Sequence, residues 1–445
     1  MREYYRENTQ LFAILIFWLI IGMYGGPLIY GVLPILLILM KSKGMYEEMF
    51  IGFFLILILS DSYEQHLLFA KSAKNIYISA LAIFFIFDRS GFQPFNTIYK
   101  LFMPFFLISV YCLFFTETAA VSIQKTMSYF LLFLVVPNYF TKLYRERGTE
   151  ILRNIIFFAT TILLISFIMI FISRNVVYPI GSRYQGILGN PNGLGLFCFF
   201  TFILFSVIRQ MHKNLFTSTE SVIIYSLVIF SLLLTGSRNS IIGVLIFVFF
   251  QKFYKINPFL GILMVIIVGF LAEIIGNHFS VIVSSFGLGD FFRAKTLDNG
   301  SGRYVAWLFA WNHIQENLFI GKGFGYDEHY MRSNWDLLSK MGHQGGIHNT
   351  FLTFWMDFGL IGLLIYLRSY FLSFIIAAKK TPLAFPILFA VTFTAIFESW
   401  LVGSLNPHNI LFLLILTLIS DDTFHSEAEI EIEKKGELML VTDNK

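Results

Sequence analysis

The chain has 445 residues, of which 56% are hydrophobic and only 13% are charged, and its mean hydropathy is +0.71. A soluble domain has no interior large enough to hide this much apolar surface, so the composition excludes a water-soluble fold. The net charge of +4 says little by itself, and no nucleic-acid partner is expected. The apolar runs are continuous rather than alternating, which predicts an all-α polytopic membrane protein and not a β-barrel.

Long apolar runs are typical of membrane spans, and such segments follow one another along most of the chain. They are residues 11–24, 28–40, 49–60, 67–87, 98–115, 124–140, 153–173, 192–210, 220–235, 239–251, 257–275, 348–376, 383–402 and 406–420. Several of the first five are short, so we expect about 12–14 transmembrane helices. No small-residue cleavage site follows the first segment, which is therefore predicted to be a span and not a signal peptide.

The distribution of basic residues predicts the orientation of these spans. Lys and Arg gather at Lys41/Lys43, Lys142/Arg145/Arg147/Arg153, Arg209/Lys213, Lys252/Lys255 and Lys379/Lys380. If all the segments span, these clusters share one side with both termini, and the positive-inside rule makes that side cytoplasmic. Lys71 and Lys74 do not follow the pattern.

The same pattern divides the chain into four regions. We expect an N-terminal transmembrane bundle (1–275), a large extracytoplasmic loop with short interfacial helices (276–347), C-terminal transmembrane helices (348–420) and an acidic cytoplasmic tail (421–445). The region 276–347 is the longest stretch without an apolar run that is long enough to span a membrane. A membrane protein with one large, mixed-charge loop is expected to work at that loop.

Polar residues from four predicted outer connections are expected to converge on one face of the membrane. The connections are 174–191, 236–238, 276–347 and 403–408. In or beside them lie Arg183, Asn190, Asn192, Arg238, Arg303, His348 and His408. This convergence, and no single residue, is the main indication of a functional site.

Arg303 opens a segment whose apolar residues follow helical spacing, with Trp307 and Trp311 on one face. An amphipathic helix with two tryptophans suits the membrane interface, and it would hold Arg303 at the level of the lipid headgroups. A guanidinium can grip a lipid-linked phosphate through two parallel hydrogen bonds. The alternative is an arginine that only reaches to the headgroups of bulk lipid.

Arg238 and the pair His348-Asn349 stand at the ends of predicted spans. A very short outer turn keeps Arg238 close to hydrocarbon, where a charge usually faces a cavity or a partner. A histidine at the outer end of a span can serve as a general base near neutral pH. The alternative for Arg238 is that it only anchors the turn, and the alternative for His348 is a purely structural role.

Asn190 and Asn192 lie in the turn Gly-Asn-Pro-Asn-Gly, which could hydrogen-bond sugar hydroxyls or could simply begin a helix. The Gly-Lys-Gly-Phe-Gly turn at 321–325 is a weak phosphate-loop signal because no strand–turn–helix context surrounds it.

Two acidic residues, Asp357 and Glu398, lie inside apolar runs, where acidic side chains usually have a functional role. They could orient Arg238 or Arg303, or could pair with each other. Cys112 and Cys198 sit in apolar runs, and no cluster of ligands has metal-binding spacing, so neither a metal site nor a cofactor is predicted.

Four stretches together resemble the O-antigen ligase and polysaccharide polymerase superfamily of bacterial membrane glycosyltransferases. The resemblance covers residues 180–402, and the first 120 residues add only hydrophobicity. The stretches are Arg183 to Asn192, Thr235 to Arg238 (Thr-Gly-Ser-Arg), Arg303 to Trp307 with Gly321 to Gly325, and His348 to Leu352 with Gly359 and Gly362 downstream.

The resemblance implies a metal-independent transfer on the extracytoplasmic face of the bacterial cytoplasmic membrane. The donor would be a glycan on a polyprenyl diphosphate. In the family, outward-facing arginines hold the diphosphate and a histidine after the large loop acts on the acceptor hydroxyl. These roles map onto Arg238, Arg303 and His348, with Arg183 as a further candidate. Asn190, Asn192, Trp307 and Asn349 are predicted to bind substrate, and Asp357 and Glu398 to support it.

The chemistry agrees with this mapping. Without a divalent metal, fixed arginines must stabilise a diphosphate leaving group, and a histidine can take the proton of the acceptor hydroxyl. A chain with 54 phenylalanines can line an apolar groove for the polyprenyl tail. The predicted reaction is a single displacement with inversion at the sugar. Expected partners are the lipid-linked oligosaccharide, membrane lipid, and flippase and chain-length regulator proteins.

Several functions remain open. Within the superfamily, a polymerase joins repeat units and a ligase moves the finished glycan to a lipid core; we favour a polymerase because no feature singles out a lipid A acceptor. A transporter or flippase is a second alternative, although no internal repeat is visible and the charges lie near span ends. A structural membrane protein is a third, against which the converging Arg and His residues argue.

Overall fold

The computed structural model describes residues 2–179, 183–256, 303–343 and 345–425. This part of the chain is mostly helical and contains no strand, which confirms the all-α prediction. Every predicted apolar segment has a helix except 257–275, which lies outside the described residues together with the first part of the large loop and residues 426–445 of the acidic tail.

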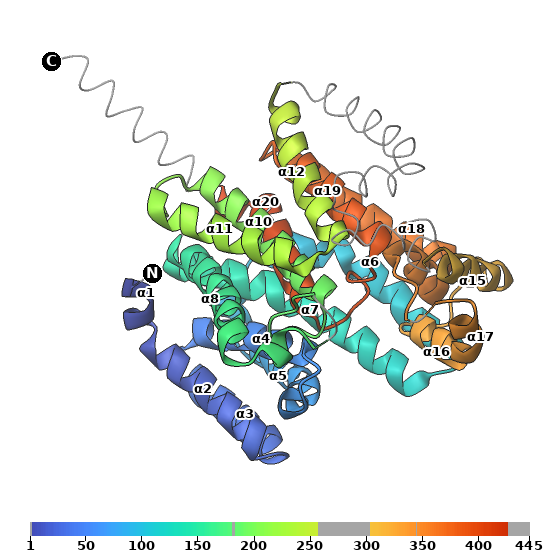
Figure 1. Cartoon of the computed structure of the whole chain (residues 1–445), viewed down its shortest axis with the longest axis horizontal. Helices are drawn as coiled ribbons and strands as arrows, with labels where there is room; N and C mark the ends of the chain where they lie inside the picture. The colour runs from blue at the N-terminus through green and yellow to red at the C-terminus, as the bar shows by residue number, and fades with distance from the viewer. Residues whose placement is uncertain (1, 180–182, 257–302, 344, 426–445) are drawn as a thin grey trace.

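The helices that correspond to predicted apolar segments follow one another from α2 to α20 (Figure 1). They are α2 (Thr9–Tyr24), α3 (Leu28–Ser42), α4 (Tyr46–Asp61), α5 (Phe69–Phe87), α6 (Thr97–Cys112), α7 (Ala119–Arg147), α8 (Glu150–Ile172), α10 (Pro191–Met211), α11 (Ser218–Thr235), α12 (Arg238–Ile256), α18 (Thr350–Ala378), α19 (Ala384–Phe397) and α20 (Pro407–Ser420). The other helices are short, apart from α15: α1 (Arg2–Glu7), α9 (Arg174–Val177), α15 (Arg303–Glu316), α16 (Tyr326–Ser333) and α17 (Trp335–Lys340).

By length and composition, seven of the described helices could cross a membrane. They are Gln65–Phe87, Thr97–Phe115, α7, α8, α10, α11 and α18, and four shorter apolar helices, α2, α3, α19 and α20, accompany them. The chain is therefore a multi-pass membrane protein. The predicted total of 12–14 spans also counts apolar helices shorter than the roughly 20 residues that a straight span needs, and the segment 257–275, which lies outside the described residues.

Two helices, α10 and α20, form the centre of the bundle (Figure 1). All of α20 is buried, as is α10 from Gly193 to Ile208. They pack against each other, α10 also packs against α11 and α12, and α20 against α7 and α18. A helix that is apolar all round is stable only when other helices cover it, and α10 and α20 are such helices.

The connections of the bundle meet at two ends. At one end, which we call the Glu398 end, Lys74 at the start of α5 donates to the carbonyl of Leu405, 2.9 Å away. The amide of Gly189, before α10, donates to Asp61 at the end of α4 over 3.3 Å. Lys74, an exception in the charge pattern, is thus used inside the protein to tie α5 to the connection between α19 and α20.

At the opposite end, which we call the Asp421 end, the connections carry most of the basic clusters. Asn154 at the start of α8 donates to Glu47 of α4 over 2.7 Å. Asn96, before α6, donates to Asp421, after α20, also over 2.7 Å. The alternation of connections that the sequence predicts is therefore found between the two ends of the described bundle.

The helix α18 is broken at Gly359, which has φ 69°. The backbone between α15 and α16 packs into the break. The carbonyls of Leu318 and Phe319 accept the amides of Leu360 and Ile361 at 2.9 and 3.3 Å. Backbone freed inside an apolar bundle must find such partners, so the large loop completes α18.

A second non-helical segment, residues 398–406, separates α19 from α20. The sequence predicted a span to residue 402, but α19 ends at Phe397. The segment is nonetheless largely buried, and side chains satisfy two of its carbonyls: Tyr129 and Asn409 donate to Leu401, and Asn406 donates to Trp400. Polar side chains of α7, of α20 and of the segment itself therefore replace missing helical hydrogen bonds, which hydropathy does not reveal.

Gly359→Ala should destabilise the protein. Its φ of 69° and ψ of 179° lie in a region that is essentially confined to glycine and costs another residue about 1–3 kcal/mol. An added Cβ would also lie 2.3 Å from the carbonyl oxygen of Phe319. We expect a lower thermal unfolding temperature and a lower yield of monodisperse protein in detergent.

Gly31→Ala is the matched control, because Gly31 lies inside α3 and an added Cβ would meet no atom within 4 Å. Alanine is the better helix former there, so its stability should be equal or slightly higher. Equal melting temperatures for the two variants would contradict the account of the break in α18.

Candidate functional site

The carboxylate of Glu398 lies at the centre of a polar cluster. Glu398 is the first residue after α19 and is only 8% exposed. The hydroxyl of Thr350, at the start of α18, donates to its backbone carbonyl over 2.8 Å. The end of α19 and the start of α18 are thereby tied together, so a charged group stands between helices at a defined place.

Three side chains from three other parts of the chain contact this carboxylate. Arg303, the first residue of α15, approaches Oε1 with a guanidinium nitrogen at 2.7 Å. The amide of Asn192, in the first turn of α10, donates to the same oxygen at 3.0 Å. His348 Nδ1 lies 3.1 Å from Oε2. We call Glu398, Arg303, His348 and Asn192 the Glu398 cluster.

The charge of Glu398 is stabilised by these neighbours. Burial by itself raises the pKa of a carboxyl, but the hydrogen bond and charge of His348, the charge of Arg303 and the amide of Asn192 outweigh it and lower the pKa of Glu398. Ionised Glu398 stabilises the folded protein at pH values above the usual carboxyl pKa. This stabilisation is lost as the pH falls through the lowered pKa of Glu398. Glu398 is thus an anion at neutral pH.

An ionised carboxylate only accepts hydrogen bonds, which determines the proton position on His348. Because Glu398 accepts, Nδ1 must carry the hydrogen, and Nε2 is the ring nitrogen left for another group. The side chain of His348 is 34% exposed, so the ring is not sealed inside the bundle. A carboxylate that orients an imidazole through Nδ1 is an arrangement suited to general-base chemistry.

The backbone of His348 is in an unusual conformation. Its φ is 52°, and among the described residues it alone combines a positive φ with a side chain other than glycine's. Asn349 follows as the N-cap of α18, and its side-chain oxygen accepts the amides of Phe351 and Leu352 at 2.9 and 3.0 Å. A left-handed residue next to a helix cap is the kind of local strain that is found at functional sites.

Arg183 extends the cluster toward α11. One guanidinium nitrogen donates to the side-chain oxygen of Asn192 at 2.8 Å, and Nε donates to the carbonyl of Thr235, at the end of α11, at 2.9 Å. Glu398, Asn192 and Arg183 therefore form a chain of charge-assisted hydrogen bonds. The predicted pair of Arg183 and Asn192 is brought together, and Thr235 is a partner that the sequence did not identify.

Arg238 lies at the same end of the bundle. It is the first residue of α12, three residues after Thr235, and is half-buried. The next residue, Asn239, donates its amide to the carbonyl of Thr394, one turn before Glu398, over 3.1 Å. The start of α12 therefore packs along α19 where α19 leads into the Glu398 cluster.

Trp307 supports the cluster from the helix that carries Arg303. Its indole nitrogen donates to the carbonyl of Ile347 at 3.0 Å, and its ring lies 6.0 Å from that of Phe397. Ile347 immediately precedes His348 in the chain, and Phe397 immediately precedes Glu398. Trp307 thus holds both segments against α15, whose buried face carries Ala306 and Ala310, small enough to allow close packing.

Two residues predicted at the site have other contacts. The carboxylate of Asp357 accepts the amides of Gly325 and Asp327, at 2.8 and 2.9 Å, so it neither pairs with Glu398 nor orients an arginine in the described structure. It anchors the 321–325 turn to α18. Asn190 caps α10 by accepting the amide of Gly193 at 2.8 Å, which is the helix-start alternative.

The chemistry of the Glu398 cluster suits an anionic substrate and a hydroxyl group. Glu398 uses one nitrogen of Arg303, and the other donors of that guanidinium remain for phosphate oxygens. In the part of the chain that the structure describes, no group of three or more His, Cys, Asp or Glu side chains could hold a metal ion.

A family model described as O-antigen ligase matches residues 223–367, roughly a third of the chain. The match runs from α11 to α18 and includes Arg238, Arg303 and His348, whereas Arg183, Asn192 and Glu398 lie outside it. No curated protein matches the chain.

Removing one partner of the Arg303–Glu398 pair should destabilise the protein more than removing both. Arg303→Gln or Glu398→Gln leaves a partly buried charge without its partner, a cost of about 1–3 kcal/mol. The double variant should be more stable than the sum of the single effects implies. Thermal unfolding in detergent, followed by tryptophan fluorescence, measures this coupling.

The exposed pair Lys322–Glu117, 3.2 Å apart, provides the control. Lys322→Gln should change stability by no more than about 0.5 kcal/mol because water screens such pairs. Strict additivity of the Arg303 and Glu398 variants would mean that the two charges do not interact.

Proposed function

The chain belongs to the O-antigen ligase and polysaccharide polymerase superfamily, and on that premise we propose that it is a polysaccharide polymerase. It transfers a glycan from a polyprenyl-diphosphate carrier to the hydroxyl of an acceptor sugar. The observation that carries the proposal is the sharing of one buried carboxylate, Glu398, by Arg303 and His348. A group that binds phosphate and a group that accepts a proton are thereby held side by side.

The imidazole of His348 is the general base. Its Nε2 takes the proton of the acceptor hydroxyl while that oxygen attacks the anomeric carbon of the donor sugar. Glu398 holds the ring by Nδ1 and stabilises the imidazolium that forms. Glu398 is therefore a positioning residue, and His348 is the residue that meets the acceptor.

The arginines stabilise the leaving group. As the new glycosidic bond forms, the bond from the anomeric carbon to the diphosphate oxygen breaks, and the electron pair leaves with the diphosphate. Arg303 and Arg238 balance the charge that develops there, in surroundings where water is partly excluded. One displacement at the anomeric carbon inverts its configuration. Arg183, held by Asn192 and Thr235, orders the side of the site that binds the diphosphate.

The site lies on the extracytoplasmic face of the bacterial cytoplasmic membrane in this proposal. The segregation of the basic clusters Arg209/Lys213 and Lys379/Lys380 to the Asp421 end supports it, because positive charge is retained in the cytoplasm. The polyprenyl tail then lies in the outer leaflet, and a flippase must deliver the donor there.

A ligase of the same superfamily would use the same chemistry with another acceptor. Deletion of the gene distinguishes the two: loss of a polymerase leaves single repeat units attached to the final acceptor, and loss of a ligase leaves long chains on the lipid carrier. We expect single units.

His348→Ala and Arg303→Ala should each abolish the glycan ladder in a deletion strain complemented with the variant. The loss of a general base lowers the rate by about 10²–10⁴-fold, and the loss of a fixed donor to developing charge by about 10²–10³-fold. Gel analysis of surface glycan and transfer of radiolabelled lipid-linked repeats by purified protein measure both.

His329→Ala and Arg332→Ala are matched controls, because both side chains are exposed on α16 in the same loop. They should leave the ladder unchanged. A normal ladder from well-expressed His348→Ala or Arg303→Ala protein would contradict the assigned roles.

The orientation can be tested by cysteine labelling in intact cells. Lys340→Cys, at the end of α17, should react with a membrane-impermeant maleimide added from outside. Lys213→Cys, exposed beyond α10 at the Asp421 end, should react only after the membrane is permeabilised. The native thiols Cys112 and Cys198 are buried and provide little background. The reverse labelling pattern would place the Glu398 cluster in the cytoplasm.

A further inference from the structure

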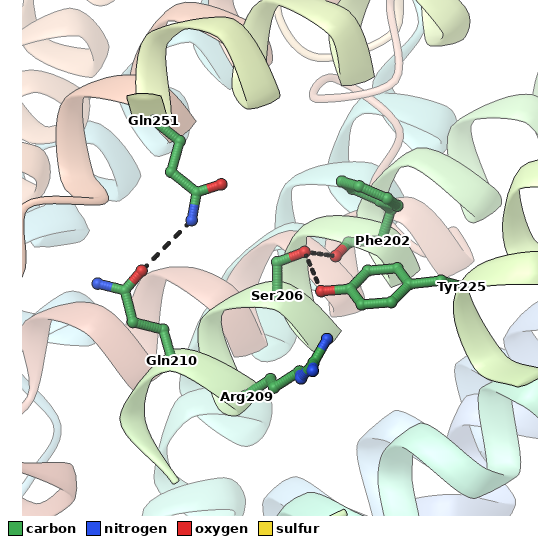
Figure 2. A pocket seen from close by; sticks show the side chains of 6 residues that line it. All are labelled: Phe202, Ser206, Arg209, Gln210, Tyr225 and Gln251. Carbon is green, nitrogen blue, oxygen red and sulfur yellow. Dashed lines mark hydrogen bonds between the residues drawn. The ribbon is translucent and has the colours of Figure 1, made fainter. Parts of the chain in front are cut away.

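A polar cavity of about 290 Å³ lies near the C-terminal end of α10, and Figure 2 shows the side chains that line it. Its walls come from α10, α11 and α12: Phe202, Ser206, Arg209, Gln210, Tyr225 and Gln251. Asn192 and Arg209 are 17 residues apart on one helix, which corresponds to roughly 25 Å. The cavity therefore lies across most of the thickness of the bundle from the candidate active site.

The cavity offers hydrogen-bond donors and a positive charge. Arg209 lies over the ring of Tyr225, with 5.8 Å between the guanidinium carbon and the ring centre, and none of the described residues that line the cavity carries a carboxylate. Within the described residues, Arg209 has no ion-pair partner. A guanidinium held against an aromatic ring without a counter-ion is suited to bind an anion.

The other polar side chains leave donors free. Gln251 donates one amide hydrogen to the side-chain oxygen of Gln210 at 3.3 Å. This contact does not use the second amide hydrogen of Gln251 or either amide hydrogen of Gln210. The hydroxyl of Ser206 donates to the carbonyl of Phe202 at 2.7 Å, so in the 3.0 Å contact with Tyr225 the tyrosine is the donor. The amides and the guanidinium are thus the groups left to meet an incoming acceptor.

The surface on either side of the cavity is apolar and exposed. On α11, Val222 and Ile229 share the face of Tyr225 and are 64% and 41% exposed. On α12, Val248 lies three residues before Gln251 and is 46% exposed. Donors for an anion flanked by exposed aliphatic side chains match a ligand with a phosphate headgroup and hydrocarbon chains.

We infer that this cavity binds the phosphate headgroup of an anionic phospholipid from the leaflet opposite the candidate active site. Arg209 pairs with the phosphate, Gln210 and Gln251 donate to its oxygens, and the acyl chains lie along the outer faces of α11 and α12. The basic residues of this end, Lys213 and Lys252, attract anionic lipid to the same surface. The inference does not depend on which glycan the protein transfers.

The test uses native mass spectrometry of the purified full-length protein in detergent, titrated with phosphatidylglycerol. Arg209→Gln should weaken retention of this lipid about tenfold, because a charge-assisted hydrogen bond is lost. Gln251→Leu should weaken it to a smaller extent. Lys379→Gln, which removes one exposed positive charge at the same end after α18, is the matched control and should bind like the unaltered protein.

Two further arms distinguish the ligand classes. Phosphatidylcholine, which has no net charge, should be retained more weakly than phosphatidylglycerol, and inorganic phosphate alone should give no Arg209-dependent adduct. Retention of phosphatidylglycerol by folded Arg209→Gln protein at the unaltered level would overturn the inference. Equal retention of the neutral lipid, or Arg209-dependent binding of inorganic phosphate without lipid binding, would overturn it as well.

Discussion

The arrangement of this protein depends on one buried carboxylate at the end of a short helix. Glu398 is contacted by Arg303, His348 and Asn192, and these residues belong to α15, the residues before α18, and α10. Burying a carboxylate is costly unless cations and donors surround it. The position of Glu398 therefore requires the large loop and two transmembrane helices to meet at one point, and the same contacts leave a guanidinium and an imidazole beside each other.

The polar cluster is possible only because the backbone departs from helix near it. Residues 398–406 are non-helical and largely buried, and α18 is interrupted at Gly359. Each interruption is satisfied from elsewhere, by side chains in the first case and by the backbone before α16 in the second. An apolar bundle tolerates such segments where partners are supplied. The loop is thus a structural part of the bundle and also the carrier of Arg303.

The two ends of the bundle differ in how they use charge. At the Glu398 end, arginine and histidine side chains are held by hydrogen bonds in a defined geometry, as with Arg183 between Asn192 and Thr235. At the Asp421 end, most basic residues are exposed, and Arg209 lies against Tyr225 beside a cavity. We therefore interpret one end as a reaction site and the other as a surface for lipid, linked by the buried helix α10.

The amino-acid sequence by itself determined the helical class, the position of each described apolar helix and the set of polar residues that could form a site, because continuous apolar runs and isolated charges within them are local properties. Arg183, Asn192, Arg303 and His348 were all identified in this way. Only the tertiary structure decided which acid belongs with them. Asp357 and Glu398 look alike in sequence, but the first anchors a turn and the second joins four segments, since long-range packing decides which partners a buried charge finds.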